Sequence, residues 1–399
     1  ELEETTGIGS VLSTRIYLKQ ANHRSTVALE NYAEPLCAIA SCLGEVYPSE
    51  FLWQAWRYLL QCHPHDSICG CSIDDVHRDM LRRFVWSQEI SQTMTQEALA
   101  SIVRRVNASS IQEGIPLLVF NPLAVERTDV AQASLTTVPQ EGKKFTLVDA
   151  STNRPVPCQV TKIEAERWEL LFLARDVPPL GYRTYVLRSG VAATEEDSYH
   201  LKSGPAFIEN EFFRVEVASN GTLTVEVKES GERYEGLHYF EERGDAGDEY
   251  NFSPPLTDSV LTSLSEKPRV SLEEQGPFRA TLKIEYVWKI PQSLSENRQS
   301  RSREYIEYPI TSFVSLYPHI RRIDIRTEVE NRAKDHRLRV GFATNIKASH
   351  SFAEMPFDVV KRNVGLSEEN MLPEKQIALK KGEEVKVATY PQGTFVSIS

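Results

Sequence analysis

The side chains best suited to chemistry are concentrated in one short segment, residues 61–71. Its sequence, Gln-Cys-His-Pro-His-Asp-Ser-Ile-Cys-Gly-Cys, contains two histidines, one aspartate and three cysteines. Imidazole, carboxylate and thiolate are the groups with which proteins bind zinc. The segment therefore predicts a metal site, and its residue types allow three interpretations.

The first interpretation is a closed structural zinc site made by Cys62, His65, Cys69 and Cys71. This C-x2-H-x3-C-x-C spacing is not a standard zinc-finger spacing, and one short loop is cramped for a tetrahedral site. The second is a polar turn with incidental thiols. In the third, one histidine completes a catalytic metal site whose other ligands lie elsewhere.

Helices must position this segment. Apolar residues recur at three- and four-residue steps from Leu29 to Leu43, and Gly44 follows as a C-terminal cap. A second, short helix is predicted from Pro48 to Leu60. A third is predicted after Ser72, with Asp75 completing a capping box. Between them, residues 62–71 are expected to be non-helical, and the whole indicates an antiparallel three-helix bundle.

From about residue 115 the hydrophobic period changes from helical to two. Short runs such as LLVFNPL, WELLFLA and RATLKIEYVWKI are separated by polar, glycine or proline turns. Many strands without intervening helices favour antiparallel sandwiches. We therefore predict an α+β multidomain chain: a three-helix bundle, a small β-sandwich and a larger, incomplete one.

Composition limits the classes of function. The net charge of −11 disfavours nucleic-acid binding, and the 41% hydrophobic content is ordinary for a globular protein. No apolar run is long enough to span a membrane, so no membrane partner is expected. Five of the six cysteines lie within the first 71 residues, which favours free thiols in a reducing compartment. We expect a cytoplasmic, bacterial setting.

Several segments together resemble the family 38 glycoside hydrolases, the class II α-mannosidases. QCHPHDSICG followed by CSIDDVHRDMLRRF resembles the family's zinc-histidine segment. LENYAEPL, LLVFNPLAVERTDVA, GDAGDEYNFSP and NRAKDHRLRVGFAT resemble other parts of the family, in the same order. The resemblance runs from about residue 11 to about residue 363.

The resemblance implies a retaining, zinc-dependent α-mannosidase that acts on mannose-containing oligosaccharides or small mannosides. In that family an N-terminal β/α domain supplies a zinc-binding His-x-Asp and the nucleophilic aspartate. This sequence has no histidine before His23. We therefore expect a middle and C-terminal fragment that contains no catalytic residue, partners the missing domain and is inactive alone. Association into a homo-oligomer is a family analogy.

The resemblance also suggests how the chain is divided. Residues 1–20 are expected to end the catalytic β/α domain, and residues 21–112 to form the helical bundle with the zinc-ligand loop. Residues 113–195 are expected to form the small β-sandwich. Residues 196–399 are expected to form a large, truncated sandwich of the mannosidase C-terminal type.

Residue by residue, the resemblance makes His65 one ligand of a single Zn²⁺ and Asp66 a contact for sugar hydroxyls. Tyr250 would reach from the sandwich into the active site. Arg337 and Arg339 alternate along a strand and share one face, so either could bind the sugar. The plainer alternatives are a turn carboxylate for Asp66, a packed tyrosine, and arginines paired with surface carboxylates.

Two further clusters have weaker interpretations. Arg15 and Lys19 lie one helical turn apart, and they border the cleft in the family or form a solvated basic face. Asp245, Asp248 and Glu249 suggest calcium, but they lack the spacing of an EF-hand loop. The alternative to an enzyme is a non-catalytic carbohydrate-binding or scaffold protein built from sandwiches, in which a zinc-ligand loop would have no role.

Overall fold

The computed structural model confirms an α+β chain with helices first and antiparallel sheets after them. It describes residues 9–107, 109, 111, 113–138, 145–164, 167–190, 201–250, 252–355, 357–364 and 394–398. The predicted boundary at 195/196 lies outside these residues, as do residues 1–8 and 365–393. No helix in the described ranges is long and apolar enough to cross a membrane.

Three long helical rods form the bundle. The first rod consists of α1 (Ile16–Thr26), a π-helical segment (Val27–Ala33) and α2 (Glu34–Cys42), which follow one another without a break. The second rod is α3 (Ser49–Leu60), and the third is α5 (Asp74–Arg104). The short helix α4 (His65–Cys69) lies between α3 and α5 in the chain. A single 3-10 turn, Gly9–Leu12, comes before them. Residues at helical spacing on α5, among them Met80 and Phe84, pack against α1, α2 and α3 in one core. This burial of one apolar face per helix is what stabilises the bundle.

Three local predictions about the bundle are corrected. The break at 62–71 contains the short helix α4. Ile73 is the N-cap residue of α5 and no side chain caps it, so the Ser72–Asp75 capping box does not form. The boundary at 20/21 falls inside α1, where Leu18 and Ala21 are both buried in the bundle core. The first helix therefore belongs to the bundle from Ile16 onward.

The small β unit is a sandwich of two antiparallel sheets, with strand orders β1-β7-β3-β4 and β2-β6-β5. The strands are β1 (Ile115–Asn121), β2 (Arg127–Leu135), β3 (Phe145–Asp149), β4 (Pro155–Val156), β5 (Cys158–Glu164), β6 (Arg167–Val177) and β7 (Gly181–Ser189). Inward-facing residues from both sheets, such as Phe172 and Tyr185, form its core. Their alternation with outward residues is why the sequence pattern predicts strands here.

The large unit is a second sandwich. One sheet has the order β13-β12-β11-β10-β9-β8 with β18 beside β12, the facing sheet has the order β14-β15-β16-β17, and a small third sheet has the order β20-β19-β21. The strands are β8 (Lys202–Gly204), β9 (Phe207–Glu209), β10 (Phe213–Val217), β11 (Leu223–Val227), β12 (Glu232–Gly244), β13 (Leu261–Thr262), β14 (Arg269–Gln275), β15 (Ala280–Pro291), β16 (Tyr305–Leu316), β17 (Asp324–Val329), β18 (His336–Phe342), β19 (His350–Met355), β20 (Asp358–Asn363) and β21 (Val396–Ile398). A 3-10 turn, Ser263–Ser265, follows β13. Trp288 is buried between the two main sheets.

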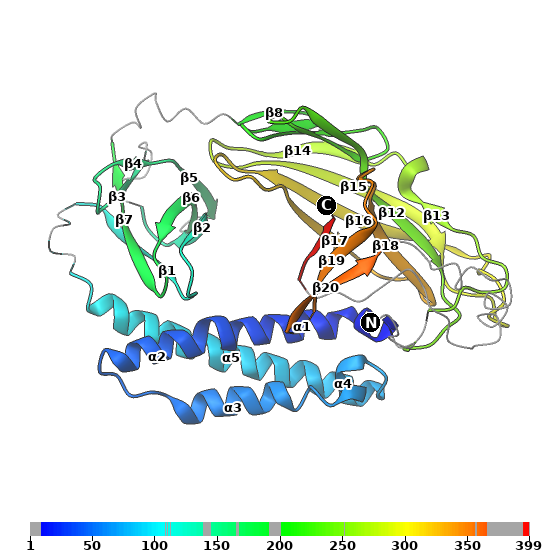
Figure 1. The fold of residues 1–399 in the computed structure, drawn as a ribbon, viewed down its shortest axis with the longest axis horizontal. Helices are drawn as coiled ribbons and strands as arrows, with labels where there is room; N and C mark the ends of the chain where they lie inside the picture. The colour runs from blue at the N-terminus through cyan, green and yellow to red at the C-terminus, as the bar shows by residue number, and fades with distance from the viewer. Residues whose placement is uncertain are drawn as a thin grey trace.

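The helices lie along one side of both sandwiches (Figure 1). The start of α1 and the short α4 lie together at one end of the bundle, near loops of the large sandwich, as Figure 1 shows. The two sandwiches share a small apolar contact in which Leu171 and Leu173 of β6 meet Phe278 and Tyr317. A hydrogen bond from Thr14, just before α1, to the carbonyl of Glu249 links the bundle to the tyrosine-bearing loop of the large sandwich.

Candidate active site

The predicted chemical segment forms one tight helical turn. Pro64 precedes α4, and its carbonyl accepts hydrogen bonds from the N–H groups of Ser67 and Ile68. Gly70 ends the turn with φ +90°, a conformation that L side chains rarely adopt. A Cβ at Gly70 would also meet Thr14 Cγ2 at 3.2 Å, so the glycine lets α4 approach the start of α1.

His65 and Asp66 open this turn and point to solvent. Nε2 of His65 lies 3.3 Å from Oδ1 of Asp66, and the side chains are 90% and 59% exposed. An exposed imidazole next to a carboxylate is able to accept a metal without losing packing. In the described ranges, however, no three histidine, cysteine, aspartate or glutamate side chains are grouped to hold a metal ion. His65 therefore fits as one ligand of an incomplete site.

The start of α1 clamps the α4 turn through two cations. Nε of Arg15 donates to the carbonyl of Gly70 at 3.0 Å, and the same guanidinium pairs with Asp74 at 2.9 Å. Nζ of Lys19 donates to the carbonyl of Cys69 at 3.1 Å, and burial lowers the pKa of Lys19 to about 8. Both side chains therefore hold the α4 turn in position. This role differs from both predictions for them, a border of the cleft and a solvated basic face.

The loop after β12 reaches the same place from the large sandwich. Oγ1 of Thr14 donates to the carbonyl of Glu249 at 3.0 Å, which ties this loop to α1. The next residue, Tyr250, forms a hydrogen bond with the thiol of Cys71, and this bond raises the pKa of Tyr250 to about 12. The Cys71 thiol in turn lies 3.5 Å from Oδ1 of Asp66. The structure thus brings Tyr250 and Asp66 together around Cys71, 184 residues apart in the chain.

The two predicted arginines lie on β18 and differ in their partners. Arg339 forms an ion pair with Glu241, its neighbour across the strands, so it follows the plainer interpretation. Arg337 lies opposite Arg243 and stacks on Phe252, with its guanidinium carbon 4.7 Å from the ring centroid. Of these two arginines, Arg337 makes no ion pair within the described ranges.

The closed zinc site is not formed. Cys62 is completely buried in the bundle core, where its thiol donates to the carbonyls of Tyr58 and Met80. Burial raises the pKa of the Cys62 thiol to about 11, which disfavours the thiolate that zinc requires. Because His65 points to solvent, these two residues do not face a common centre.

The acidic residues suggested for calcium support a turn. Oδ1 of Asp245 accepts hydrogen bonds from the N–H groups of Gly247 and Ser253, at 2.9 and 3.0 Å. Oδ1 of Asp248 accepts one from the N–H of Tyr250 at 2.9 Å. These carboxylates shape the loop that carries Tyr250, and they are not part of any group of three or more potential metal ligands among the described residues.

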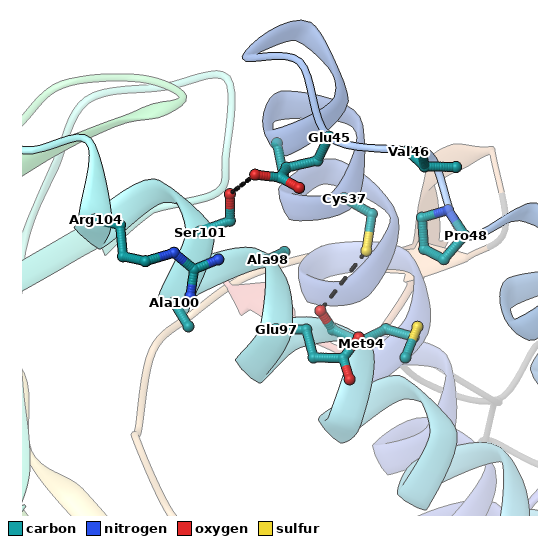
Figure 2. Close-up of a pocket in the computed structure, with 11 residues that line it drawn as sticks. Cys37, Glu45, Val46, Pro48, Met94, Glu97, Ala98, Ala100, Ser101 and Arg104 are labelled. Atoms are coloured by element: carbon teal, nitrogen blue, oxygen red, sulfur yellow. Dashed lines mark hydrogen bonds between the residues drawn. The ribbon is translucent and has the colours of Figure 1, made fainter.

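One cavity lies away from these residues. A pocket of 320 Å³ is lined by residues from the end of α2 and the last turns of α5, among them Cys37, Glu45 and Arg104 (Figure 2). Ser101 donates to Glu45 at 2.7 Å across its rim, as Figure 2 shows. Because α5 is about 46 Å long at 1.5 Å per residue, this pocket is at the opposite end of the bundle from His65. It does not contain any of the predicted site residues.

Sequence reasoning missed Thr14 and the bridging role of Cys71. No sequence pattern marks Thr14, because its hydroxyl bonds to a carbonyl 235 residues away in the chain. The cysteine was considered only as a metal ligand. Its position directly after Gly70, whose conformation turns the chain toward the sandwich loop, was the available clue.

Comparisons with known proteins agree with this arrangement. Residues 208–380 match the family model described as the glycosyl hydrolases family 38 C-terminal domain. Residues 9–102 match the alpha mannosidase middle domain. The first model covers the large sandwich with Tyr250, and the second covers most of the bundle with His65.

Individual relatives show the same likeness. A putative mannosylglycerate hydrolase from Halalkalibacterium halodurans is 25% identical over 413 residues, which cover 90% of this chain and 46% of the relative. An alpha-mannosidase from Enterococcus faecalis has a structure similar to this one, with a TM-score of 0.80, 28% identity, and coverage of 90% of this chain and 46% of that one. A second Enterococcus faecalis structure, of a family 38 glycosyl hydrolase, gives a TM-score of 0.78 at 28% identity, covering 89% and 48%. The chain thus spans about half the length of the relatives that it matches.

Proposed function

Because this chain belongs to glycosyl hydrolase family 38, we propose that it supplies the accessory half of the active site of a retaining, zinc-dependent α-mannosidase. The observation that carries the proposal is the junction of α4, α1 and the loop after β12, where Asp66 and Tyr250 meet around Cys71. The nucleophile and the acid/base are expected in the part of the relatives that this chain does not span. The chain alone is expected to be inactive, since the covalent step needs that nucleophile.

His65 is the proposed zinc ligand. Its imidazole is exposed and held next to Asp66 on a turn fixed by Arg15 and Lys19. When bound, zinc would hold and polarise sugar hydroxyls. The remaining ligands are expected from outside the described residues, in which no three histidine, cysteine, aspartate or glutamate side chains are grouped to hold a metal ion.

Asp66 and Tyr250 are the proposed sugar contacts. The Asp66 carboxylate is acceptor-only when ionised, so it suits the hydroxyl groups of a sugar. Tyr250 is partly exposed and offers both a ring face and a hydroxyl. Because two separate elements present these groups, a mannoside bound here would contact the bundle and the sandwich together.

A docking surface for the partner domain lies beside this site. Leu12, Ile16 and Tyr17 at the start of α1 are each more than two-fifths exposed. Large apolar side chains grouped at the surface are typical of an interface. We propose that they contact the part of the enzyme that carries the nucleophile.

The test uses the full-length protein that contains this chain. The His65→Ala variant should lose bound zinc and lose hydrolysis of 4-nitrophenyl α-mannoside together, as measured by elemental analysis and initial rates. The His23→Ala variant, which removes an exposed imidazole on α1, is the matched control and should keep both. A wild-type protein that binds mannosides but never hydrolyses them would favour the carbohydrate-binding alternative, and unchanged zinc in His65→Ala would refute the ligand assignment.

A further inference from the structure

Arg298 joins three loops of the large sandwich beside the proposed sugar site. It lies in the connection between β15 and β16, and its two terminal nitrogens reach different neighbours. Nη1 pairs with Oδ1 of Asp335, in the turn between β17 and β18, at 3.0 Å. Nη2 donates to the carbonyl of Gly247, in the loop after β12, at 3.2 Å. One side chain therefore ties the loop that carries Tyr250 to two other connections.

Backbone groups hold the same loop at two further points. The carbonyl of Asp335 accepts a hydrogen bond from the N–H of Asp245 at 2.9 Å, directly after β12 ends. Further along the loop, the carbonyl of Glu249 accepts a hydrogen bond from Thr14 of the bundle at 3.0 Å. The bond from the guanidinium lies between these two points. The segment before the tyrosine is therefore held from the sandwich as well as from the bundle.

The local backbone presents the Arg298 side chain in a strained conformation. Arg298 has φ +56°, in the left-handed region that residues with side chains rarely adopt. Its N–H donates to the carbonyl of Ser295 at 2.8 Å, and Oδ1 of Asn297 accepts a hydrogen bond from the N–H of Gln299 at 3.1 Å. Strain that neighbouring hydrogen bonds maintain is typical of functional positions. The backbone at Arg298 therefore agrees with a role for its side chain.

The contacts of Arg298 are too exposed to stabilise the whole fold. The Arg298 and Asp335 side chains are 48% and 33% exposed, and ion pairs this exposed contribute little to the free energy of unfolding. Loops, however, open locally at a much lower cost in free energy than the unfolding of a domain. A weak contact is therefore enough to decide how often this loop is in place.

We propose that Arg298 is a positioning residue, which holds the loop after β12 so that Tyr250 stays beside Asp66 and Cys71. This inference rests on the proposed function, because it assigns the support of one of the proposed sugar contacts. Arg298 itself does not touch the sugar in this account.

The first experiment uses the full-length protein and does not depend on hydrolysis. Amide hydrogen exchange of residues 245–253, followed by mass spectrometry, reports how often the loop opens. In Arg298→Gln this exchange should become about 3- to 10-fold faster, as expected from the loss of one exposed hydrogen bond and ion pair. Exchange in β15 and β16 and the thermal unfolding midpoint should stay unchanged. Unchanged exchange of residues 245–253 would overturn the proposal.

The second experiment measures hydrolysis of 4-nitrophenyl α-mannoside by the same protein. A loop that is in place for only part of the time weakens apparent binding by that fraction, and bound sugar restores the loop. Arg298→Gln should therefore raise KM about 3- to 10-fold and leave kcat nearly unchanged. Arg298→Lys should recover part of the loss, because a lysine can donate to one of the two acceptors. A lower kcat with an unchanged KM would overturn the proposal.

Two comparisons separate positioning from a general loss of structure. Arg303→Gln removes an exposed arginine from the same connection, one that makes no hydrogen bond or ion pair within the described ranges, so it should change neither exchange nor KM. In a Tyr250→Ala background, Arg298→Gln should raise KM much less than in the wild type, because its effect passes through Tyr250. Equal effects of Arg298→Gln in the two backgrounds would overturn the proposal.

The two experiments also separate this proposal from the proposed function. Faster exchange of the loop in Arg298→Gln, in a protein that hydrolyses no mannoside, would support the hold of Arg298 on the loop and refute the proposed function. Hydrolysis with unchanged exchange and unchanged KM in the variant would keep the proposed function and overturn the role of Arg298.

Discussion

Charged residues are buried on one face of the β12–β18 strand pair and are partly exposed on the other face. On the inner face, Glu242 is 0% exposed and Arg301 is 6% exposed, and the two form a bidentate ion pair that His336 adjoins at 3.3 Å. On the outer face Glu241 and Arg339 form a partly exposed ion pair, and in the loop beyond it Tyr250 and the nearby Asp66 have polar groups open to solvent.

This difference separates structural charges from functional ones. A buried charge is tolerated only when its partner is in place, so the inner cluster is fixed by the fold. Exposed groups gain little stability from their geometry, yet the clamps from α1 hold the α4 turn in a defined position. Order without burial is what a binding site needs, because the groups must still be free to contact a ligand.

The largest effect is expected on the inner face. Glu242→Gln removes the carboxylate that pairs closely with the buried Arg301 and leaves only Asp258, 3.8 Å away, so the free energy of unfolding should fall by about 3 kcal/mol in urea denaturation of the chain. Glu241→Gln, one residue away in the exposed pair with Arg339, should cost less than about 1 kcal/mol. If the two variants lower the free energy of unfolding by similar amounts, the buried charges are not more important for stability than the exposed ones.

A smaller effect is expected for a second buried carboxylate, Glu209. Burial opposes its ionisation, but hydrogen bonds from Lys228, Arg214 and Lys202 outweigh burial and lower its pKa to about 2. A lowered pKa gives stability that is present above the unfolded-state pKa near 4.5 and is lost as the pH falls toward 2.

Glu209→Gln should therefore lower the free energy of unfolding by about 1–3 kcal/mol at pH 7 and flatten its decline below pH 4.5. Urea denaturation at a series of pH values measures both. Parallel pH profiles for the variant and the wild type would show that the three cations do not hold this carboxylate ionised.

The smallest effect on stability is expected where α4, the start of α1 and the loop after β12 meet. Tyr250→Phe should leave the free energy of unfolding nearly unchanged, because its hydroxyl is at the surface. In the full-length protein the same variant should lower kcat/KM for a mannoside at least about tenfold. Tyr305→Phe, an exposed tyrosine at the start of β16, should change neither. A Tyr250→Phe protein that is clearly less stable but fully active would show that Tyr250 has a structural role and does not contact the sugar.

Local periodicity accounts for what the sequence predicts well. The apolar residues of α3 and α5 recur at helical spacing, and strands such as β15 and β16 alternate, so each element carries its own signal. Their burial pattern repeats the sequence pattern. The bundle and both sandwiches could therefore be predicted without knowledge of tertiary contacts.

Contacts between distant segments explain what the sequence does not predict. Arg15 and Lys19 find their acceptors on a turn 55 and 50 residues away, which neither a border of the cleft nor a solvated basic face predicts. Cys62 and Cys71 have the same side chain, but one is buried in the bundle core and the other bridges Asp66 and Tyr250. His65 and Tyr250 were identified by family resemblance, and their roles stay predictions.

The central claim is that His65 is one ligand of a zinc site that this chain does not complete. The zinc content of the purified 399-residue chain after dialysis, measured by elemental analysis, tests this claim most directly. An incomplete site with His65 as its one ligand should hold almost no zinc, since structural zinc needs about four protein ligands. One tightly bound zinc per chain would contradict this account, because it would require a complete set of ligands around the α4 turn.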